Sequence, residues 1–494
     1  MRLIREKACS LLALTFLFLS SSAVVSAQAP LQPIPPATES RDNQLRDRLL
    51  QNIDAHQNLM RDLEELCDDI GARLTGSESL RRAQQWASAK LRAYGADAVW
   101  EEDYILGSTW HRGRSQARLL NANRQIMAMA QAGWTSSSSK PIQAEVAILD
   151  ASNLDELRHQ LPQLKGKIVL LLRTPKLSSV AGAVSEAQRN DFSREYNAVL
   201  KQADFAAVLY VSARSGNLLD MHGGPKARFK HNVGIIGQQD AQLLQRLIKR
   251  GISPRLELQF GGGFDGKPGS PVVREKNLIA EIRGTEFPDE YVVLGVHLDS
   301  WDLASGATDN GVGVALVMEV LRSIGAMRAI GTIRASQIPM KRSLRVILFS
   351  GEEQGLLGSK AYVEGHQSEL GKVQAMLTID SGAGRIIGIP DMQVDGWYDA
   401  LNTMTNAHPL LQKLEVVYAV SKGSDHESFF AQGVPAFSLA QEPLDYLSHT
   451  WHSEADTLDH VKKDDLVYNA KVLSLISQYL LNSPRLPHRV DRKN

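Results

Sequence analysis

The chain has 494 residues, of which 43% are hydrophobic and 22% charged, so it can bury a large core and is expected to form two or three domains. This composition excludes a disordered or fibrous protein. Acidic and basic residues number 55 each, and this balance gives no reason to expect nucleic-acid or anionic-membrane partners.

The first 27 residues have the order of a secretory signal peptide. Three basic residues precede an apolar stretch from Ala8 to Leu19, and "VSA" ends at Ala27, where cleavage is expected. The apolar stretch is short for a membrane span, and a retained N-terminal anchor is the alternative. We therefore predict a secreted or periplasmic protein. After cleavage Cys67 would be the only cysteine, which excludes an intramolecular disulfide.

The next segments carry clear local patterns. A Pro-rich linker is predicted at 28–42, and helical periodicity follows at about 42–68 and 77–95. Between about 98 and 150 the period shifts towards two, which predicts strands.

Strands and short helices continue through 165–173, 205–212 and 231–251, as in a small α/β module. The glycine-rich joint "QFGGGFDGKPGSP" would end this module near residue 270. We therefore predict a main domain that is interrupted by an inserted domain. The expected boundaries are 43–125 for the N-terminal part of the main domain, 126–268 for the insert and 269–494 for the C-terminal part of the main domain.

Three continuous apolar runs mark the C-terminal part of the main domain: "YVVLGVH", "SLRVILFSGEE" and "VQAMLTIDSG". Helix-like sequence follows the first two runs. Apolar strands that alternate with helices predict an α/β fold, with a parallel sheet covered on both faces. In such sheets ligands bind beyond the carboxyl ends of the strands, which is where each run changes to acids or histidine.

Histidine and carboxylates at these positions are the ligand types that zinc accepts. The strand ends, the turn after the first strand and the later "HTWHSEADT" together supply six of them: His297, Asp309, Glu352, Glu353, Asp380 and His452. Any one of these alone is more often a turn or surface residue, but the ordered set favours a metal site. Two metals that share a bridging carboxylate need five protein ligands, which leaves one acid spare.

The spare acid is Glu352, which neighbours Glu353 but points the other way and therefore suits a general base. Asp299 lies two residues from His297 on the same strand face, and its side chain is expected to accept the proton on the second ring nitrogen. His449 competes with His452 as a ligand by proximity alone, whereas the pattern "HSEADT" favours His452.

The motifs "HLDSWD", "GATDNGVG", "SGEEQGLLGS", "DSG" and "HSEADT" occur in an order that resembles the co-catalytic zinc exopeptidases of peptidase family M28. The resemblance extends to "IGARLTGSESLRRAQQWA" near the N-terminus and covers nearly all of the chain after the signal peptide. It implies a mixed, mostly parallel sheet covered by helices on both faces, the zinc-exopeptidase type. It also implies an inserted protease-associated β/α domain.

The same resemblance implies two Zn²⁺ per chain. One would be held by His297 and Asp380 and the other by Glu353 and His452, with Asp309 bridging them. The Asp309–Asn310 peptide bond is expected to be cis, and Asp299 would support His297. The implied catalytic residues are Glu352, as general acid/base, and Asp299.

The implied activity is hydrolysis of the terminal peptide bond of dipeptides or short peptides by a metal-bridging hydroxide, with Glu352 passing the proton to the departing amine. Whether the amino or the carboxy end is recognised stays open. Asp425, His426, Tyr446 and His449 are expected near the substrate pocket, without assigned roles. The insert is expected either to gate the substrate or to contact a second subunit in a homodimer.

Two other functions are alternatives. A glutaminyl-cyclase-like acyltransferase would use a single zinc, and a non-catalytic receptor-like binding protein would have lost ligands. The insert and the complete two-metal ligand set argue against the acyltransferase. No ligand is lost from the set, which argues against the binding protein.

Overall fold

The computed structural model describes residues 36–172, 186–224, 230–265, 273–330 and 340–487. The predicted signal peptide and residues 28–35 of the predicted linker lie outside these ranges. The described residues from Leu45 onward form one compact unit, and the functional residues named above all belong to it.

The main sheet has six strands in the order β1-β12-β14-β13-β15-β18. Their bounds are β1 (Ala98–Gly107), β12 (Val273–Ile282), β13 (Phe287–His297), β14 (Arg342–Phe349), β15 (Val373–Thr378) and β18 (Ala436–Ser438). Neighbouring strands from β14 to β18 are parallel, whereas β12 runs antiparallel to both β14 and β1. The predicted mixed, mostly parallel sheet is therefore confirmed.

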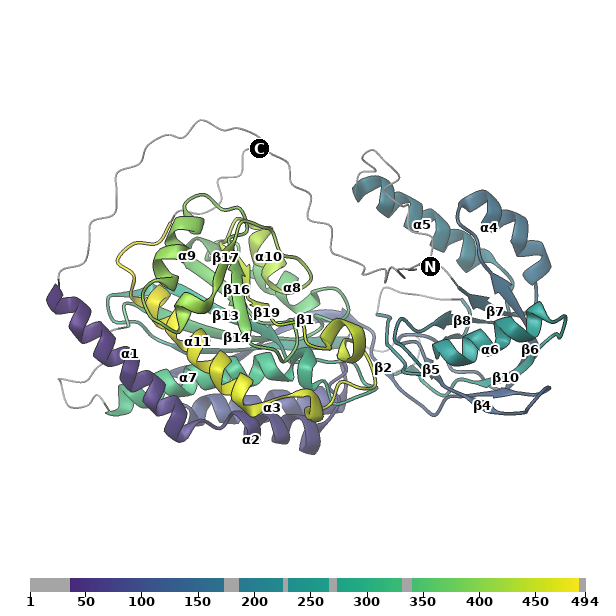
Figure 1. The fold of residues 1–494 in the computed structure, drawn as a ribbon, viewed down its shortest axis with the longest axis horizontal. Helices are drawn as coiled ribbons and strands as arrows, with labels where there is room; N and C mark the ends of the chain where they lie inside the picture. Colours follow the sequence, from purple (N-terminus) through teal and green to yellow (C-terminus); the bar gives the residue numbers. More distant parts are fainter. Residues whose placement is uncertain (1–35, 173–185, 225–229, 266–272, 331–339, 488–494) are drawn as a thin grey trace, which may run out of the picture. The chain divides into compact units, whose positions relative to one another are not determined.

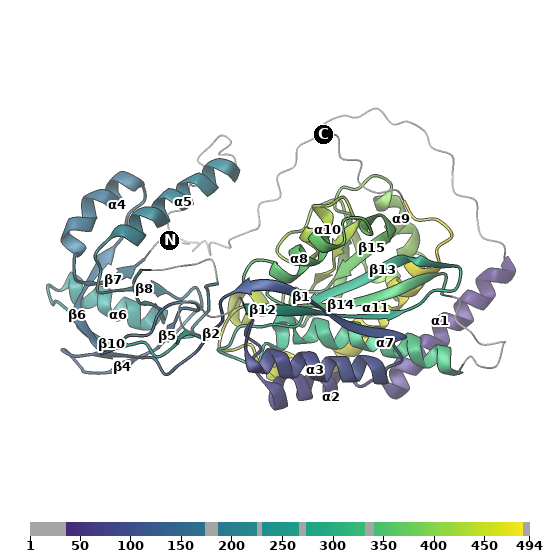
Figure 2. The ribbon, with the colours of Figure 1, turned by 180° about the vertical axis from the view of Figure 1, so that it is seen from behind.

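Helices cover both faces of this sheet, as Figure 2 shows for α3 and α7 on one face and α8 and α10 on the other. The helices of the main domain are α2 (Leu59–Glu64), α3 (Glu78–Ala93), α7 (Val312–Ile330), α8 (Leu357–Gly365), α9 (Trp397–Thr405), α10 (His426–Phe430) and α11 (Lys463–Asn482). Within β13, Leu294 and Val296 join the core beneath α7, while Val293 joins the core with Tyr362 and Phe429. Because alternate residues enter two different cores, the strand is apolar along its whole length.

By length and composition alone, one described stretch, Ala307–Arg328, could cross a membrane, with a mean hydropathy of 1.3. In the structure 94% of its most apolar window is buried inside the protein. The stretch includes most of α7, so its apolar character is accounted for by the core of the main domain.

A second sheet has eight strands in the order β4-β3-β10-β6-β7-β8-β9-β5 (Figure 1). They are β3 (Gln116–Leu119), β4 (Ile126–Met127), β5 (Met129–Gln131), β6 (Ile142–Leu149), β7 (Ile168–Leu171), β8 (Ala207–Val211), β9 (Val233–Ile236) and β10 (Arg255–Gln259). The helices α4 (Leu154–Gln160) and α5 (Glu186–Gln202) accompany it together with α6 (Gln238–Lys249). Separate apolar clusters line its two faces, one with Leu157 of α4 and the other with Leu244 of α6.

The second sheet occupies the segment of the predicted insert, but it begins earlier than residue 126. β3 pairs with both β4 and β10, so residues 116–119 belong to this sheet and not to the main domain, where we placed them. The sheet to which β3 belongs is decided by its long-range pairing with β10, and the sequence of β3 itself does not show this pairing.

The N-terminal helices also differ from the prediction. α1 spans Pro36–His56, so the predicted linker is wrong for residues 36–42. Proline is compatible with the first turn of a helix because its fixed φ is helical and its missing N–H would be unpaired there in any case. The predicted helix at 42–68 is interrupted after His56, where the Gln57 side chain accepts a hydrogen bond from the Leu59 N–H and α2 begins. The predicted helix at 77–95 is confirmed as α3, with Ser77 as its N-cap.

Three short strands form a separate small sheet in the order β17-β16-β19. They are β16 (Ile386–Pro390), β17 (Glu415–Val417) and β19 (Ala440–Gln441). A further pair of strands consists of β2 (Trp110–His111) and β11 (Gly263–Phe264). In the sequence, β2 lies where the chain passes from the main domain to the second sheet, and β11 lies where it returns.

Candidate metal centre

The predicted ligands come together at the carboxyl edge of the main sheet. His297 is the last residue of β13, and Asp380 lies two residues beyond the end of β15. Glu353 follows β14 by four residues. Parallel neighbouring strands bring their carboxyl ends to one edge, and the register pairs His297 with Phe349 at the end of β14.

Two sets of ligand atoms share the carboxylate of Asp309. In the first set, Nε2 of His297 lies 3.2 Å from Oδ1 of Asp380 and 3.3 Å from Oδ1 of Asp309. In the second set, Nε2 of His452 lies 3.0 Å from Oε2 of Glu353 and 3.7 Å from Oδ2 of Asp309. Each oxygen of Asp309 therefore faces a different set. Ligand atoms of His297, Asp309 and Glu353 also lie within 4.8 Å of one another.

These spacings and this chemistry suit zinc. Tetrahedral zinc with bonds of about 2.0–2.1 Å separates its ligand atoms by about 3.3 Å, which is close to the distances within both sets. Apart from the 3.0 Å contact of Glu353 with His452, the buried oxygens Oδ2 of Asp309 and Oε2 of Glu353 have no hydrogen-bond partner among the described residues. Such atoms are costly unless a cation compensates them. Asp309, Glu353 and His452 line one small pocket.

The electrostatics also point to a missing positive charge. Burial raises the pKa of Glu352 well above its ordinary value, and the neighbouring carboxylates of Asp380 and Glu353 raise it further. The pKa of Glu353 is raised in the same way, first by burial and then by Asp309. For His297, burial lowers the pKa, but the adjacent Asp380 and Asp309 outweigh burial and raise it well above its usual value. Divalent cations are often the largest charges in such sites and would offset this excess of acids.

Asp299 differs from the prediction. The nearest acceptor for Nδ1 of His297 is the main-chain carbonyl of Asp299 at 2.9 Å, whereas its carboxylate Oδ1 is 3.7 Å away. The carboxylate instead accepts a hydrogen bond from the Thr75 hydroxyl at 2.8 Å and lies 3.3 and 3.4 Å from the main-chain N–H groups of Glu352 and Glu353. Its side chain therefore holds the turn that carries the two glutamates, and its main chain supports His297.

Asp456 was not predicted, although the quoted motif "HSEADT" contains it. Its carboxylate accepts hydrogen bonds from the Thr308 N–H at 2.6 Å, the Thr308 hydroxyl at 2.7 Å and the Asp309 N–H at 3.1 Å. The Asp309–Asn310 bond is cis, as expected. Burial and the nearby Asp309 raise the pKa of Asp456 to about 7. Asp456 thus anchors the loop that presents the shared ligand.

Arg73 is a second residue that we did not single out, within the motif "IGARLTGS". It is completely buried. Its guanidinium donates hydrogen bonds to the main-chain carbonyls of Leu298, Ser305 and Gly306 at 2.7, 2.6 and 2.8 Å. It therefore ties the N-terminal turn to both ends of the loop between β13 and Asp309. The sequence shows the arginine but not its partners, because main-chain carbonyls are present in every residue.

The two candidate histidines of the last motif lie in different places. His452 reaches Asp309 and Glu353, whereas the ring of His449 lies 5.4 Å from that of His460. The geometry therefore brings His452, and not His449, to the metal site, as the motif favoured.

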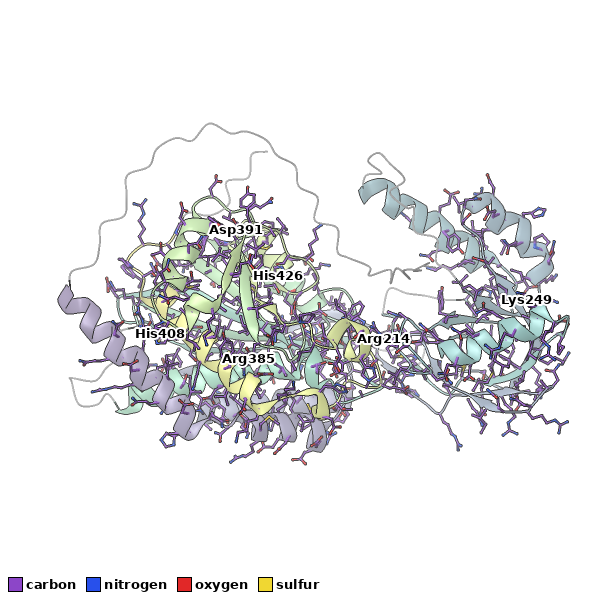
Figure 3. The ribbon with its side chains drawn as sticks, in the orientation of Figure 1. Arg214, Lys249, Arg385, Asp391, His408 and His426 are labelled. Carbon is purple, nitrogen blue, oxygen red and sulfur yellow. The ribbon has the colours of Figure 1, made fainter. Side chains whose placement is uncertain are left out.

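The residues expected near the substrate pocket are largely buried. Asp425 and His426 are fully buried at the start of α10, where His426 is labelled in Figure 3. Burial raises the pKa of Asp425 to about 7. Tyr446 packs against Gly382 of "DSG" so closely that a Cβ at this glycine would lie 2.8 Å from Cγ of the tyrosine. Tyr446 is thereby held beside the metal site, and burial together with the charge of Asp309 raises its pKa well above the usual value.

Comparisons with known proteins find similarity to peptidases. The model of peptidase family M28 matches residues 277–476. Carboxypeptidase Q from Xenopus laevis is 29% identical over 401 residues, which cover 79% of this chain and 79% of that protein. A peptidase M28 precursor of known structure from Shewanella amazonensis is 27% identical, with a TM-score of 0.74 over 91% of this chain and all of that chain. The fold also resembles that of a zinc aminopeptidase from Bacillus subtilis, which is 16% identical, with a TM-score of 0.61 over 85% of this chain and 94% of that chain.

Proposed function

We infer that this chain is a zinc-dependent metalloexopeptidase of peptidase family M28. We propose that it uses two zinc ions to hydrolyse the terminal peptide bond of dipeptides or short peptides. The observation that carries this proposal is the shared carboxylate of Asp309. One oxygen faces His297, which also contacts Asp380, and the other faces His452, which also contacts Glu353.

In this proposal the first zinc is held by His297, Asp380 and Asp309, and the second by Glu353, His452 and Asp309. When bound, the pair of ions polarises the scissile carbonyl and activates the attacking water. The protein contributes the fixed arrangement of the ligands. The main-chain carbonyl of Asp299 orients the ring of His297, which is the usual way in which a ligating imidazole is kept in one tautomer.

Glu352 carries the proton in the reaction. It is adjacent to Glu353 but belongs to neither pair of ligand atoms, so its carboxylate is free to act as a base. It takes a proton from the attacking water as the C–O bond forms, and it gives that proton to the amine nitrogen as the C–N bond breaks. The raised pKa that burial gives Glu352 is consistent with a group that must both accept and release a proton.

The complete ligand set distinguishes this function from the two alternatives. A one-zinc acyltransferase needs no second set of ligands, and a binding protein without catalysis needs neither set. We further propose export by the N-terminal signal peptide and short peptides as the natural substrates.

The test is the zinc content of the purified protein together with hydrolysis of a dipeptide panel, before and after chelation. We expect two zinc ions per chain and activity that is lost with the chelator. Glu352→Gln should keep both ions but lose turnover by at least about a hundredfold. Glu364→Gln, the same change on the exposed side of α8, is the matched control and should behave as wild type. One zinc per chain would favour the acyltransferase, and no zinc would contradict an enzyme of either kind.

The same panel identifies the recognised end of the substrate. Dipeptides with an acetylated amino end and dipeptides with an amidated carboxy end are compared with the unblocked form. Loss of hydrolysis on acetylation alone indicates an aminopeptidase, and loss on amidation alone indicates a carboxypeptidase. Loss of hydrolysis with each of the two blocks separately indicates a dipeptidase.

A further inference from the structure

His452 is held differently from His297. Its backbone has a φ of +56°, a left-handed conformation that is uncommon for residues other than glycine. Its Nδ1 atom is buried and has no hydrogen-bond partner among the described residues, whereas ligating histidines usually donate this second N–H to an oxygen. Neither local backbone preference nor a second hydrogen bond therefore fixes the orientation of this ring.

The main chain around His452 is instead paired with a segment that follows β8 in the second sheet, Leu219–His222. The Met221 N–H donates to the carbonyl of His452 at 2.7 Å, and Asp220 forms an antiparallel bridge with Ser453. This pairing covers the residue with the unusual φ and its neighbour.

Glu454 extends the pairing by one residue and adds a side chain to it. Its N–H donates to the carbonyl of Leu219 at 3.1 Å, while its carboxylate accepts the Leu219 N–H at 3.0 Å. Arg214, labelled in Figure 3, places its guanidinium 5.4 Å from the ring centre of Trp451 and donates to the carbonyl of Leu447. Contacts from the chain that follows β8 therefore continue on both sides of His452.

Aromatic rings confine the imidazole itself. The ring centres of Trp451, Trp301 and His222 lie 4.1, 5.9 and 6.1 Å from that of His452. His222 belongs to the same segment, and the carboxylate of Asp220 holds its Nε2 at 3.2 Å. Packed rings restrict side-chain rotation even where no hydrogen bond does.

We propose that the Leu219–His222 segment is a positioning element of the metal centre, which holds His452 in the orientation that binds metal through backbone pairing, Glu454 and the ring of His222. This segment is then part of the metal site. Loss of its contacts lowers the affinity for the metal at Glu353 and His452, while the metal at His297 and Asp380 is retained. This inference rests on the proposed two-zinc function.

The test is a chelator titration of the zinc-loaded protein, in which the zinc that remains is measured at each chelator concentration. The wild type should release its two ions in separate steps, and Asp380→Asn identifies the step that belongs to the His297 set. His222→Ala and Glu454→Ala, singly and together, should weaken only the other step, by about 10- to 100-fold, as is typical when residues that support a ligand are removed. A general loss of structure would weaken both steps, so the selective effect separates positioning from stability.

Conservative variants and a distant control complete the experiment. His222→Phe keeps a ring against His452, and Glu454→Gln keeps an oxygen for the Leu219 N–H, so each should remain within about threefold of wild type. His111→Ala removes an exposed histidine that pairs with Asp265 and should have no effect. The side chain of His222 is 59% exposed, so its replacement by alanine is compatible with folding.

The outcomes separate the two proposals. If the wild type binds two zinc ions and the double variant holds both with unchanged affinity, the positioning role is refuted and the proposed function stands. If the wild type binds fewer than two ions, the two-zinc function fails, and the inference fails with it.

Discussion

Replacement of Arg73 by methionine tests how far one buried side chain supports the metal centre. Besides the carbonyls of Leu298, Ser305 and Gly306, its guanidinium contacts the carbonyl of Gly71 at 3.2 Å. Methionine fills a similar volume but donates no hydrogen bond, so four carbonyls lose a charged donor. Hydrogen bonds to charged groups contribute about 1.5–3 kcal/mol each, and water or relaxation of the loop recovers part of this, so we expect a loss of about 4 kcal/mol.

This loss can be measured as a change in Tm by scanning calorimetry of the zinc-free protein. The entropy of unfolding is about 2.1 cal/mol/K per residue, so about 4 kcal/mol in a folded unit of about 450 residues lowers the Tm by about 4 °C. Arg73→Lys keeps the charge and up to three donors and should lose about half as much. Arg81→Met removes an exposed arginine whose carboxylate partner, Glu78, is also exposed, and should change the Tm by less than about 0.5 °C. A fall of less than about 1 °C for Arg73→Met would refute the idea that these carbonyls depend on the guanidinium.

Three further predictions concern other positions. For Glu65, burial raises the pKa, but hydrogen bonds from Lys90 and other neighbours outweigh burial and lower it to about 2 from 4.5. Ionised Glu65 therefore stabilises the fold above about pH 4.5 by about 1–2 kcal/mol after allowance for partial exposure, and this contribution is lost as the pH falls towards 2. The difference in unfolding free energy between wild type and Glu65→Gln, measured in urea, should shrink over this range. A constant difference would contradict the assignment. Asp456→Asn replaces one acceptor oxygen by an amide donor that faces an N–H, and we expect zinc affinity to fall by about 10-fold or more in chelator competition. Unchanged affinity would show that the Asp309 loop keeps its conformation without this carboxylate. Gly382→Ala would place a Cβ 2.8 Å from Cγ of Tyr446 at a residue whose φ is +97°. This substitution should lower kcat more than it changes zinc content. Wild-type kinetics would exclude a role for the position of this tyrosine.

Much of the metal site could be predicted because the chemistry is encoded where strands end. An apolar run that stops at His297 or Asp380 marks the carboxyl edge of a parallel sheet, and neighbouring strands bring these ends together without any further information. The same logic predicted β13, β14 and β15 of the main sheet, since burial on two faces is a local pattern. Helical periodicity, which is also local, predicted the helix that begins after Ser77.

The tertiary structure decided which groups support those ligands. The carboxylate of Asp299 holds the turn of the two glutamates while its carbonyl meets His297, and the bonds of Arg73 also end on carbonyls, which are the same in every residue type. β3 belongs to the second sheet through its pairing with β10, and His452 is paired with a segment more than 200 residues before it. Local sequence determines where a strand stops and which side chains stand there. Contacts between distant main-chain groups depend on how the whole chain closes, and for this reason only the folded structure reveals them.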